Sequence, residues 1–292
     1  MSPHSAPEPS IQDQYSDEKT YKYGSSAYYA YLFLAQDTQK DIKLLHAFFH
    51  EISNVLYIST ESSVARLKLS WWKNEIEQLF HGKPEHPISQ ALVATIKKYD
   101  LKKQYFDYIV ESVEMDLSHN RYLDWTSLKN FCTMQSGAFA CLITQVLAPT
   151  NEQNIRFAQK LGVAIHFTHL LRGLGQDATQ GRIYIPMDFL REHQIKAADI
   201  LNAKYSDEFR VFMQAQGNYA RQLFKEALPY LAPESRQALR PCLIKANLCL
   251  KLLKALEKDQ WRVLDKGISL SPVSKLLTAS KVWLSQGRYF GM

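Results

Sequence analysis

The sequence has few cysteines, no long apolar run and no concentrated charge of one sign. Only 4 cysteines occur in 292 residues, and none has the C-x-x-C spacing of a zinc or redox site, so we predict free thiols in a reducing compartment. No apolar stretch approaches the roughly eighteen residues that a membrane-spanning helix needs. The 35 Lys and Arg residues only slightly exceed the 29 Asp and Glu residues and form no polybasic run, so nucleic acid is not expected as a partner.

The first part of the chain, residues 1–22, is polar and rich in Ser, Pro, Glu and Gln. It lacks the hydrophobic core of a signal peptide and the arginines of a mitochondrial presequence. A segment of this composition buries too little apolar surface to fold alone. We therefore expect a disordered tail over residues 1–22 and a folded domain over residues 23–292. We also expect a cytoplasmic protein without a signal peptide or transmembrane helix, whose contact with a membrane, if it makes any, is peripheral.

From Tyr23 onward, apolar residues recur three and four positions apart, which is typical of helices that bury one face. Two such runs are Leu44, Leu45, Phe48, Phe49, Ile52, Val55 and Leu56, and Leu67, Trp71, Ile76, Leu79 and Phe80. Adjacent Trp71 and Trp72 cannot share a helix face, so we expect one in the core and the other against a neighbouring helix or a partner. Turn residues interrupt the pattern, but no interruption is long enough to be an interdomain linker. The sequence therefore predicts an all-α fold, a single domain of many helices around a central cavity.

Residues 166–186 contain the most specific motif of the chain. A helical stretch is followed by the segment Gly-Arg-Ile-Tyr-Ile-Pro, and the residues that define the motif are Leu171, Arg172, Asp177, Gly181, Arg182, Tyr184 and Pro186. The pattern resembles the second aspartate-rich motif of the squalene/phytoene synthases. A single motif of this length is weak evidence, so the rest of the chain has to support it.

Other segments resemble the same family and occur in the family's order. They are residues 66–73 with their Trp-Trp pair, His86-Pro87, residues 131–137 and the closing stretch 275–283; Glu111 and Asp116 stand where the family has an acidic helix. The resemblance extends from about residue 23 to residue 290. It implies the all-α fold of isoprenoid synthases, with its helices around a central cavity.

The family resemblance also implies a reaction. Squalene/phytoene synthases join two prenyl diphosphates head to head inside an apolar cavity. Two clusters of carboxylates on facing helices hold Mg²⁺ ions, which bind the diphosphate and stabilise its charge as it leaves. The resemblance therefore implies that the activity depends on these carboxylates.

The chain departs from the family at both clusters. In the first cluster, His50 replaces an arginine, and Ser53, Asn54 and Tyr57 stand where the resemblance calls for aspartates. In the second cluster, His169 replaces an asparagine, Gly173 an aspartate and Gln176 a glutamate, so that Asp177 is the acidic residue that remains. Thr133 stands where the family has a tyrosine near the cation. We expect these changes to prevent the binding of the usual three Mg²⁺ ions.

The resemblance places a degenerate diphosphate and prenyl pocket in this chain. Its expected residues are His50, Ser53, Asn54, Thr133, Gly137, His166, His169, Arg172, Gly173, Asp177, Arg182 and Tyr184. We assign no catalytic residue among them, and Asp177 alone is a weak metal ligand. Arg172 and Arg182 either bind phosphate or form structural ion pairs with residues such as Asp177.

The histidines of the two motifs suggest a further alternative. His46 and His50 are four residues apart, His166 and His169 are three apart, and the resemblance places their helices face to face. Imidazoles suit Zn²⁺ better than Mg²⁺, so the two pairs are candidates for a replacement metal site. Histidines that are buried in the core or exposed at the surface are the competing interpretation.

We favour a non-catalytic member of the family that binds an isoprenoid or another lipid. The pattern of replaced aspartates resembles the phytoene-synthase-like mitochondrial complex I assembly factor, which implies a respiratory-complex or membrane-peripheral protein as partner. The alternative is an active head-to-head prenyltransferase of the squalene or phytoene synthase type, acting with Mg²⁺ on farnesyl or geranylgeranyl diphosphate. A third interpretation is a helical scaffold with no ligand in its cavity. No cofactor is expected unless the prenyltransferase alternative holds.

Overall fold

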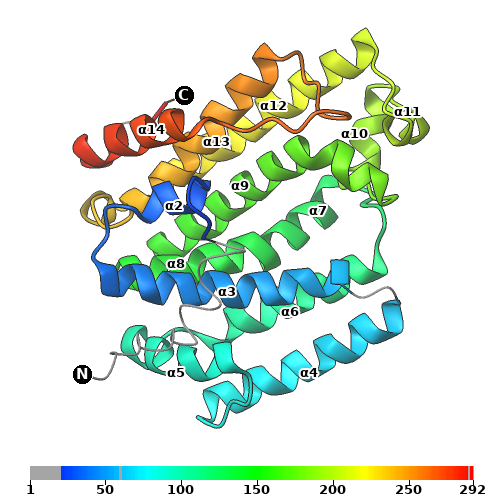
Figure 1. Ribbon diagram of the computed structural model, residues 1–292. Helices are drawn as coiled ribbons and strands as arrows, with labels where there is room; N and C mark the ends of the chain where they lie inside the picture. The colour runs from blue at the N-terminus through cyan, green and yellow to red at the C-terminus, as the bar shows by residue number, and fades with distance from the viewer. Residues whose placement is uncertain (1–20, 59–60, 289, 292) are drawn as a thin grey trace, which may run out of the picture.

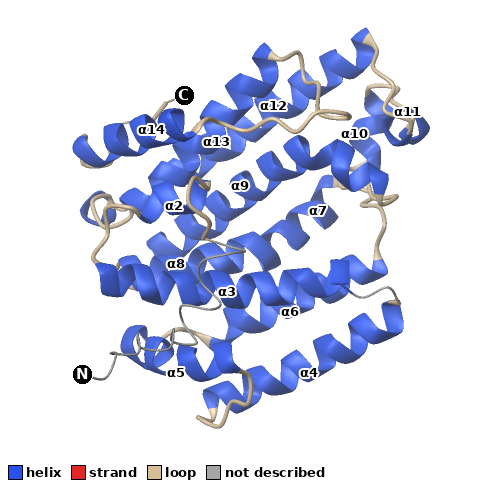
Figure 2. Ribbon diagram, viewed as in Figure 1, coloured by secondary structure: helices blue, strands red, loops and turns tan. Residues whose placement is uncertain are grey.

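Helices form the regular structure of residues 21–58, 61–288 and 290–291, the part of the chain that this computed structural model describes (Figure 2). The α-helices are α2 (Ser26–Tyr31), α3 (Gln36–Ile58), α4 (Ser62–Phe80), α5 (Pro87–Tyr99), α6 (Lys103–Ser118), α7 (Trp125–Cys132), α8 (Ala138–Leu147), α9 (Glu152–Thr179), α10 (Met187–Glu192), α11 (Ala197–Leu201), α12 (Asp207–Ala227), α13 (Arg240–Lys258) and α14 (Pro272–Leu284). A π-helix, η1 (Thr133–Gly137), joins α7 to α8, and the 3-10 helices are η2 (Leu228–Tyr230) and η3 (Pro233–Ser235). The prediction of an all-α fold is confirmed.

The start of the described chain differs from the expected domain boundary. Residues 1–20 of the predicted tail lie outside the described residues. Tyr21, which we expected in the tail, is only 5% exposed, and its ring centroid lies 6.2 Å from that of Tyr31 and 6.4 Å from that of His46. The packed part of the chain therefore includes Tyr21 and begins earlier than residue 23.

Local sequence signals explain where several helices begin. The side chains of Ser25, Asp124, Asn151, Ser206 and Ser271 each accept a hydrogen bond from a backbone N–H of the first helical turn. Such caps satisfy donors that the helix itself leaves unpaired. Proline stands in the first turn of α5, α13 and α14, where its missing N–H costs nothing.

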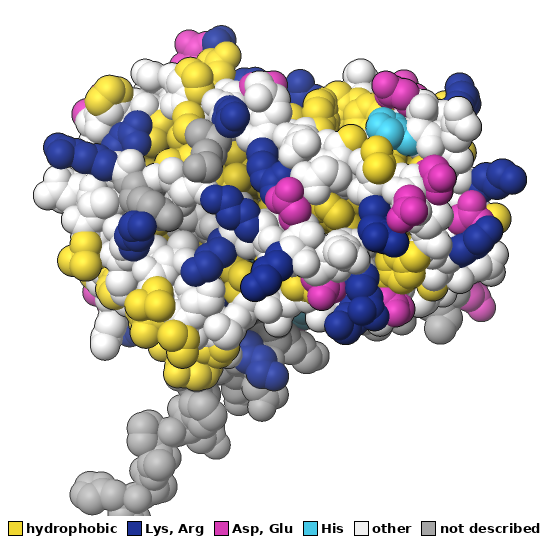
Figure 3. Space-filling model, turned by 90° about the horizontal axis from the view of Figure 1, so that it is seen from above, with side chains coloured by type: hydrophobic (Ala, Val, Ile, Leu, Met, Phe, Trp, Pro, Cys, Tyr) yellow, Lys and Arg dark blue, Asp and Glu magenta, His cyan; other side chains and the backbone are white. Residues whose placement is uncertain are grey.

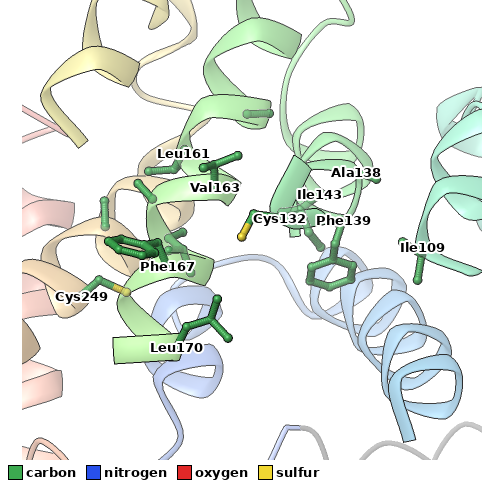
Figure 4. Packing of buried hydrophobic residues seen from close by; sticks show 14 of the residues in the cluster. Ile109, Cys132, Ala138, Phe139, Ile143, Leu161, Val163, Phe167, Leu170 and Cys249 are labelled. Carbon is green, nitrogen blue, oxygen red and sulfur yellow. The ribbon is translucent and has the colours of Figure 1, made fainter. Parts of the chain in front are cut away.

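Helix α9 runs through the middle of the molecule, with α12, α13 and α14 on one side and α3, α6 and α4 on the other (Figure 1). It packs directly against α8, α12, α13 and η1. Buried residues occur on all sides of α9, which is expected for a helix enclosed by others rather than lying at a surface. Figure 4 shows buried side chains of this packing, among them Cys249 of α13 and Phe167 and Leu170 of α9.

The buried face of helix α4 differs from the one that the sequence pattern predicted. Its inward face is formed by Ala65, Leu69, Trp72, Ile76 and Leu79. Leu67, assigned to the apolar run, is 71% exposed, because the true inward face is offset from the one that we predicted. The expectation for the adjacent tryptophans is confirmed: Trp72 is buried, whereas Trp71 is 41% exposed and its ring lies 6.0 Å from that of His86.

The surface over α12, α13 and α14 carries Lys and Arg side chains interspersed with hydrophobic and acidic ones (Figure 3). On α14, Val273, Leu277 and Leu284 are among the exposed apolar residues. A pocket of about 250 Å³ lies between α13 and α14 and includes Lys251, Lys254 and Lys281. None of the described helices is both long and apolar enough to span a bilayer.

A close approach between two backbones fixes the position of η1 against α9. A Cβ atom at Gly162 of α9 would lie 2.4 Å from the carbonyl oxygen of Ser136 and 2.6 Å from the Cα of Gly137. These contacts are with backbone atoms, which cannot rotate away as a side-chain end can. A glycine is therefore required at this point of α9.

We predict that Gly162→Ala lowers the free energy of unfolding by roughly 2 kcal/mol, because the methyl group forces η1 and α9 apart in a packed core. Urea unfolding followed by tryptophan fluorescence measures this change. The matched control is Gly267→Ala, since a Cβ there meets no atom within 4 Å. Equal unfolding midpoints for the two variants would contradict the prediction.

Candidate functional site

A cavity of about 420 Å³ lies between α3, α6, α9 and the segment containing η1. We call it the polar chamber, because more than half of the residues around it have polar or charged side chains. Its lining residues are Phe49, Ser53, Leu56, Val113, Asp116, Phe131, Gln135, Ser136, His166, His169, Leu170, Arg172, Gly173, Gln176, Asp177, Gln180 and Tyr184. Residues from both aspartate-rich motif positions and from the segment around residues 131–137 therefore line the same chamber.

A second, smaller cavity of about 130 Å³ adjoins the polar chamber. We call it the apolar chamber; its lining residues are Tyr31, His46, Phe49, Ser136, Phe139, Ala140, Ile143, Leu161, Gly162, Ile165, His169, Cys242 and Lys245. Phe49, Ser136 and His169 line both chambers. The two cavities therefore share these three side chains as a common boundary.

Asp116 of α6 is the most extensively bonded carboxylate of the polar chamber. Arg182 donates from Nη1 to its Oδ1 at 3.0 Å, and the Tyr184 hydroxyl donates to its Oδ2 at 2.7 Å. Both partners follow α9, so these bonds tie the segment after α9 to α6. Burial raises the pKa of Asp116 to about 6, although the Tyr184 hydrogen bond and the Arg182 charge oppose the increase.

Asp177 of α9 is the other carboxylate in the chamber lining. Burial, and secondly the nearby charge of Asp116, raise the pKa of Asp177 to about 6, while Arg182 and Arg172 oppose the increase. Its carboxylate lies over Gly173, where an added Cβ would be 3.4 Å from Oδ2. Near neutral pH the two aspartates thus form a pair of repelling carboxylates that a proton readily neutralises.

The histidines of this region each contact a different side chain. The His166 Nδ1 lies 3.0 Å from the Ser136 hydroxyl, the His169 Nε2 lies 3.9 Å from the Cys249 thiol, and the His46 Nε2 lies 3.4 Å from the Tyr31 hydroxyl. Burial lowers the pKa of His166 to about 4 and holds the pKa of His46 well below the usual range. Desolvation by surrounding protein atoms lowers the pKa of His169 in the same direction, although part of this side chain is exposed. All three imidazoles are therefore neutral at pH 7.

The residues expected in the pocket divide into two groups. Those that line the polar chamber are Ser53, His166, His169, Arg172, Gly173, Asp177 and Tyr184. His50, Asn54, Thr133, Gly137 and Arg182 do not. The side-chain nitrogen of Asn54 lies 2.8 Å from the His50 Nδ1, so these two side chains contact each other.

Three of the expected pocket residues have structural contacts instead. The Thr133 hydroxyl donates back to the Lys129 carbonyl at 2.8 Å, and Gly137 packs against Gly162. We had considered Asp177 as an ion-pair partner of Arg182, but the ion pair of Arg182 in the structure is with Asp116. Arg172, by contrast, makes no ion pair with any described residue and remains exposed at the chamber.

Several lining residues were absent from the predicted pocket. Gln135 and Ser136 belong to the π-helix η1. Such helices are often found at functional sites, but the local sequence does not predict them. Asp116 was noted as part of an acidic helix, but its role as the acceptor for Arg182 and Tyr184 depends on residues 66 and 68 positions away. Lys245, which lines the apolar chamber, belongs to none of the motifs that the sequence analysis identified.

The residues present do not fit a centre of several magnesium ions. Mg²⁺ is normally held through carboxylate oxygens, and Asp116 and Asp177 are the acidic side chains in the lining of the polar chamber. Among the described residues, no group of three or more His, Cys, Asp or Glu side chains is placed to hold a metal ion. The same observation gives no support to a zinc site made from the two histidine pairs.

Comparison with known proteins agrees with this architecture. The profile of the squalene/phytoene synthase family matches residues 20–274. A chloroplastic phytoene synthase 2 from Solanum lycopersicum is 27% identical over 263 residues, covering 88% of this chain and 85% of that one. A chloroplastic phytoene synthase from an Oncidium hybrid cultivar is 26% identical over 262 residues, and the chain spans only 64% of its length. The crystal structure of a dehydrosqualene synthase in complex with ligand shares the fold, with a TM-score of 0.79, 18% identity and coverage of 90% and 92% of the two chains.

The raised pKa values of Asp116 and Asp177 lead to a prediction about stability. A carboxyl whose pKa is about 6 when folded and roughly 4 when unfolded stabilises the fold at low pH, and this contribution is lost as pH rises through 6. Asp177→Asn removes one of the two repelling charges. We expect the variant to be more stable than the wild type at pH 7.5, by on the order of 2 kcal/mol, and equally stable near pH 4.

Thermal unfolding measured from pH 4 to pH 8 tests this expectation. The control is Glu111→Gln, which removes an exposed carboxylate from α6 outside the chamber lining. The prediction fails if the Asp177→Asn variant and the wild type lose stability in parallel across this range.

Proposed function

Because the chain belongs to the squalene/phytoene synthase family, we propose that it binds an isoprenoid or another lipid chain in its two chambers without the magnesium-dependent coupling of two prenyl diphosphates. A ligand that carries a phosphate would place this end in the polar chamber. Arg172, exposed at this chamber and without an ion-pair partner in the described chain, is suited to contact a phosphate there. The apolar chamber provides space for part of the chain.

The carboxylates of the polar chamber carry the proposal. Coupling would require cations that stabilise the leaving diphosphate, and such cations would need several oxygen ligands from the protein. Asp116 already accepts hydrogen bonds from Arg182 and Tyr184, which leaves Asp177 as the acidic side chain without such bonds in the lining. This donor set supports retention of a ligand more than ionisation of a diphosphate.

The second candidate is an active head-to-head prenyltransferase of the squalene or phytoene synthase type. The relatives favour it: they are named phytoene synthases and match 88% of this chain. Their names support this alternative better than the non-catalytic interpretation, whereas the side chains of the polar chamber support the non-catalytic one. The role in assembling respiratory complex I stays a prediction from the resemblance of the replaced residues.

The two candidates differ in a direct measurement. We predict no detectable release of diphosphate when the protein is incubated with farnesyl or geranylgeranyl diphosphate and Mg²⁺, since each missing electrostatic group costs roughly 10²–10³ in rate. A coupled diphosphate assay with extraction of hydrocarbon products measures the activity, and an active phytoene synthase serves as the positive control. Steady release of diphosphate with formation of a C30 or C40 product would overturn the proposal and establish the alternative.

Binding is tested by closing the polar chamber. Gly173 lines this chamber, and a Cβ atom there meets only Asp177 within 4 Å, so the backbone leaves room for a side chain and Gly173→Trp should fill the space without unfolding the helix. We expect at least tenfold less lipid to co-purify with this variant than with the wild type, as measured by mass spectrometry. Val93→Trp, at an exposed position of α5, is the matched control. Wild-type protein that purifies with no lipid and binds no farnesyl diphosphate would refute the proposed function.

A further inference from the structure

The apolar chamber contains an unexpected basic residue. Lys245 of α13 lies among its lining residues, together with Tyr31, Phe139, Ile143 and Ile165. Part of the side chain stays accessible, while surrounding protein atoms desolvate the ammonium group strongly enough to lower its pKa. A chamber meant only for the end of a hydrocarbon chain has no need of such a group.

No carboxylate of the described residues balances the charge of Lys245. Among the described residues, no carboxylate lies within ion-pair distance of its Nζ, which instead rests 5.9 Å from the centroid of the Tyr31 ring and 5.8 Å from that of Phe139. Cation–π contacts offset little of the free energy needed to bury an unpaired ammonium group. The site is therefore incomplete in electrostatic terms.

The groups around Lys245 do not supply a negative charge at neutral pH. Burial raises the pKa of the Cys242 thiol to about 11 and that of the Cys249 thiol to about 12, so both are uncharged. His46 and His169 also line the chamber as neutral imidazoles, and the charge of Lys245 contributes to keeping them so. A neutral imidazole still carries one N–H that can donate to an oxygen acceptor.

We propose that Lys245 binds the carboxylate of an apolar monocarboxylic acid, whose chain passes between Phe49, Ser136 and His169 into the polar chamber. This inference rests on the proposed function, because it needs an open path between the two chambers. One carboxylate matches the single charge of Lys245, whereas a diphosphate would bring a greater negative charge into a chamber with one cation. The imidazoles of His46 and His169 are the additional donors.

The size of the chambers agrees with this arrangement. The apolar chamber, at about 130 Å³, is much smaller than the polar chamber of about 420 Å³. In this arrangement it therefore receives only the carboxylate end of a long acid. The rest of a long chain has to lie in the polar chamber, against the apolar side chains of Leu56, Val113 and Leu170.

The test compares dodecanoate with dodecanol, which has the same chain without the charge. Isothermal titration calorimetry at pH 7.5 should show wild-type protein binding dodecanoate at least tenfold more tightly than dodecanol. Lys245→Met should abolish this preference and at the same time raise the melting temperature of the ligand-free protein, because an unpaired buried charge is replaced by an apolar side chain of similar length. Lys258→Met, at an exposed position of the same helix, should leave both measurements unchanged.

A further variant and three other possible results also test the inference. Lys245→Arg keeps the charge and should retain the preference for dodecanoate, which separates loss of charge from loss of folding. Equal affinities of the wild type for the acid and the alcohol, or unchanged dodecanoate binding by Lys245→Met, would overturn the inference but leave the proposed function standing. Failure of the wild type to bind dodecanoate, dodecanol and farnesyl diphosphate alike would overturn both.

Discussion

The close contact between α9 and η1 at Gly162 is the constraint on which the rest of the cavity depends. It brings the π-helix against the central helix, so that Ser136 faces His166 and His169 on the following turns of α9. The same segment of α9 continues to Arg172 and Asp177, and therefore carries one wall of both chambers. A larger residue at position 162 would displace this wall as a unit, because the atoms in contact belong to backbones.

The electrostatics of the cavity are unusual for a site that would bind diphosphate through metal ions. Its imidazoles are neutral, its two aspartates have raised pKa values, and the adjoining apolar chamber contains a lysine without a carboxylate partner in the described chain. A metal centre needs the opposite arrangement, with several ionised oxygen ligands close together. The described lining of the cavity lacks such a cluster of ionised oxygen ligands.

The sequence was sufficient for the fold and for part of the site. Helical periodicity predicted the all-α architecture, and the motif around Arg172 and Asp177 located residues that line the polar chamber. The face of α4 was misassigned at Leu67, because periodicity alone does not show which of two adjacent faces meets the core. The Asp116–Arg182 pair was missed, since residues so far apart meet only when α6 and the segment after α9 pack together. Lys245 was missed for a similar reason: along α13 it resembles any lysine of an amphipathic helix, and only the surrounding helices enclose it.

The burial of the four cysteines has a practical consequence for measuring motion in this protein. Cys132, Cys141, Cys242 and Cys249 are free, buried thiols, and burial raises the pKa of each of them. A thiol reagent therefore reaches them only when the surrounding helices open, so the labelling rate reports the free energy of that opening. Cys242 lines the apolar chamber whereas Cys132 does not, so the two thiols separate local breathing of this chamber from opening elsewhere in the domain. The native cysteines thus report local opening of the helices around them. A cysteine introduced at the surface would react with a thiol reagent faster than these buried ones.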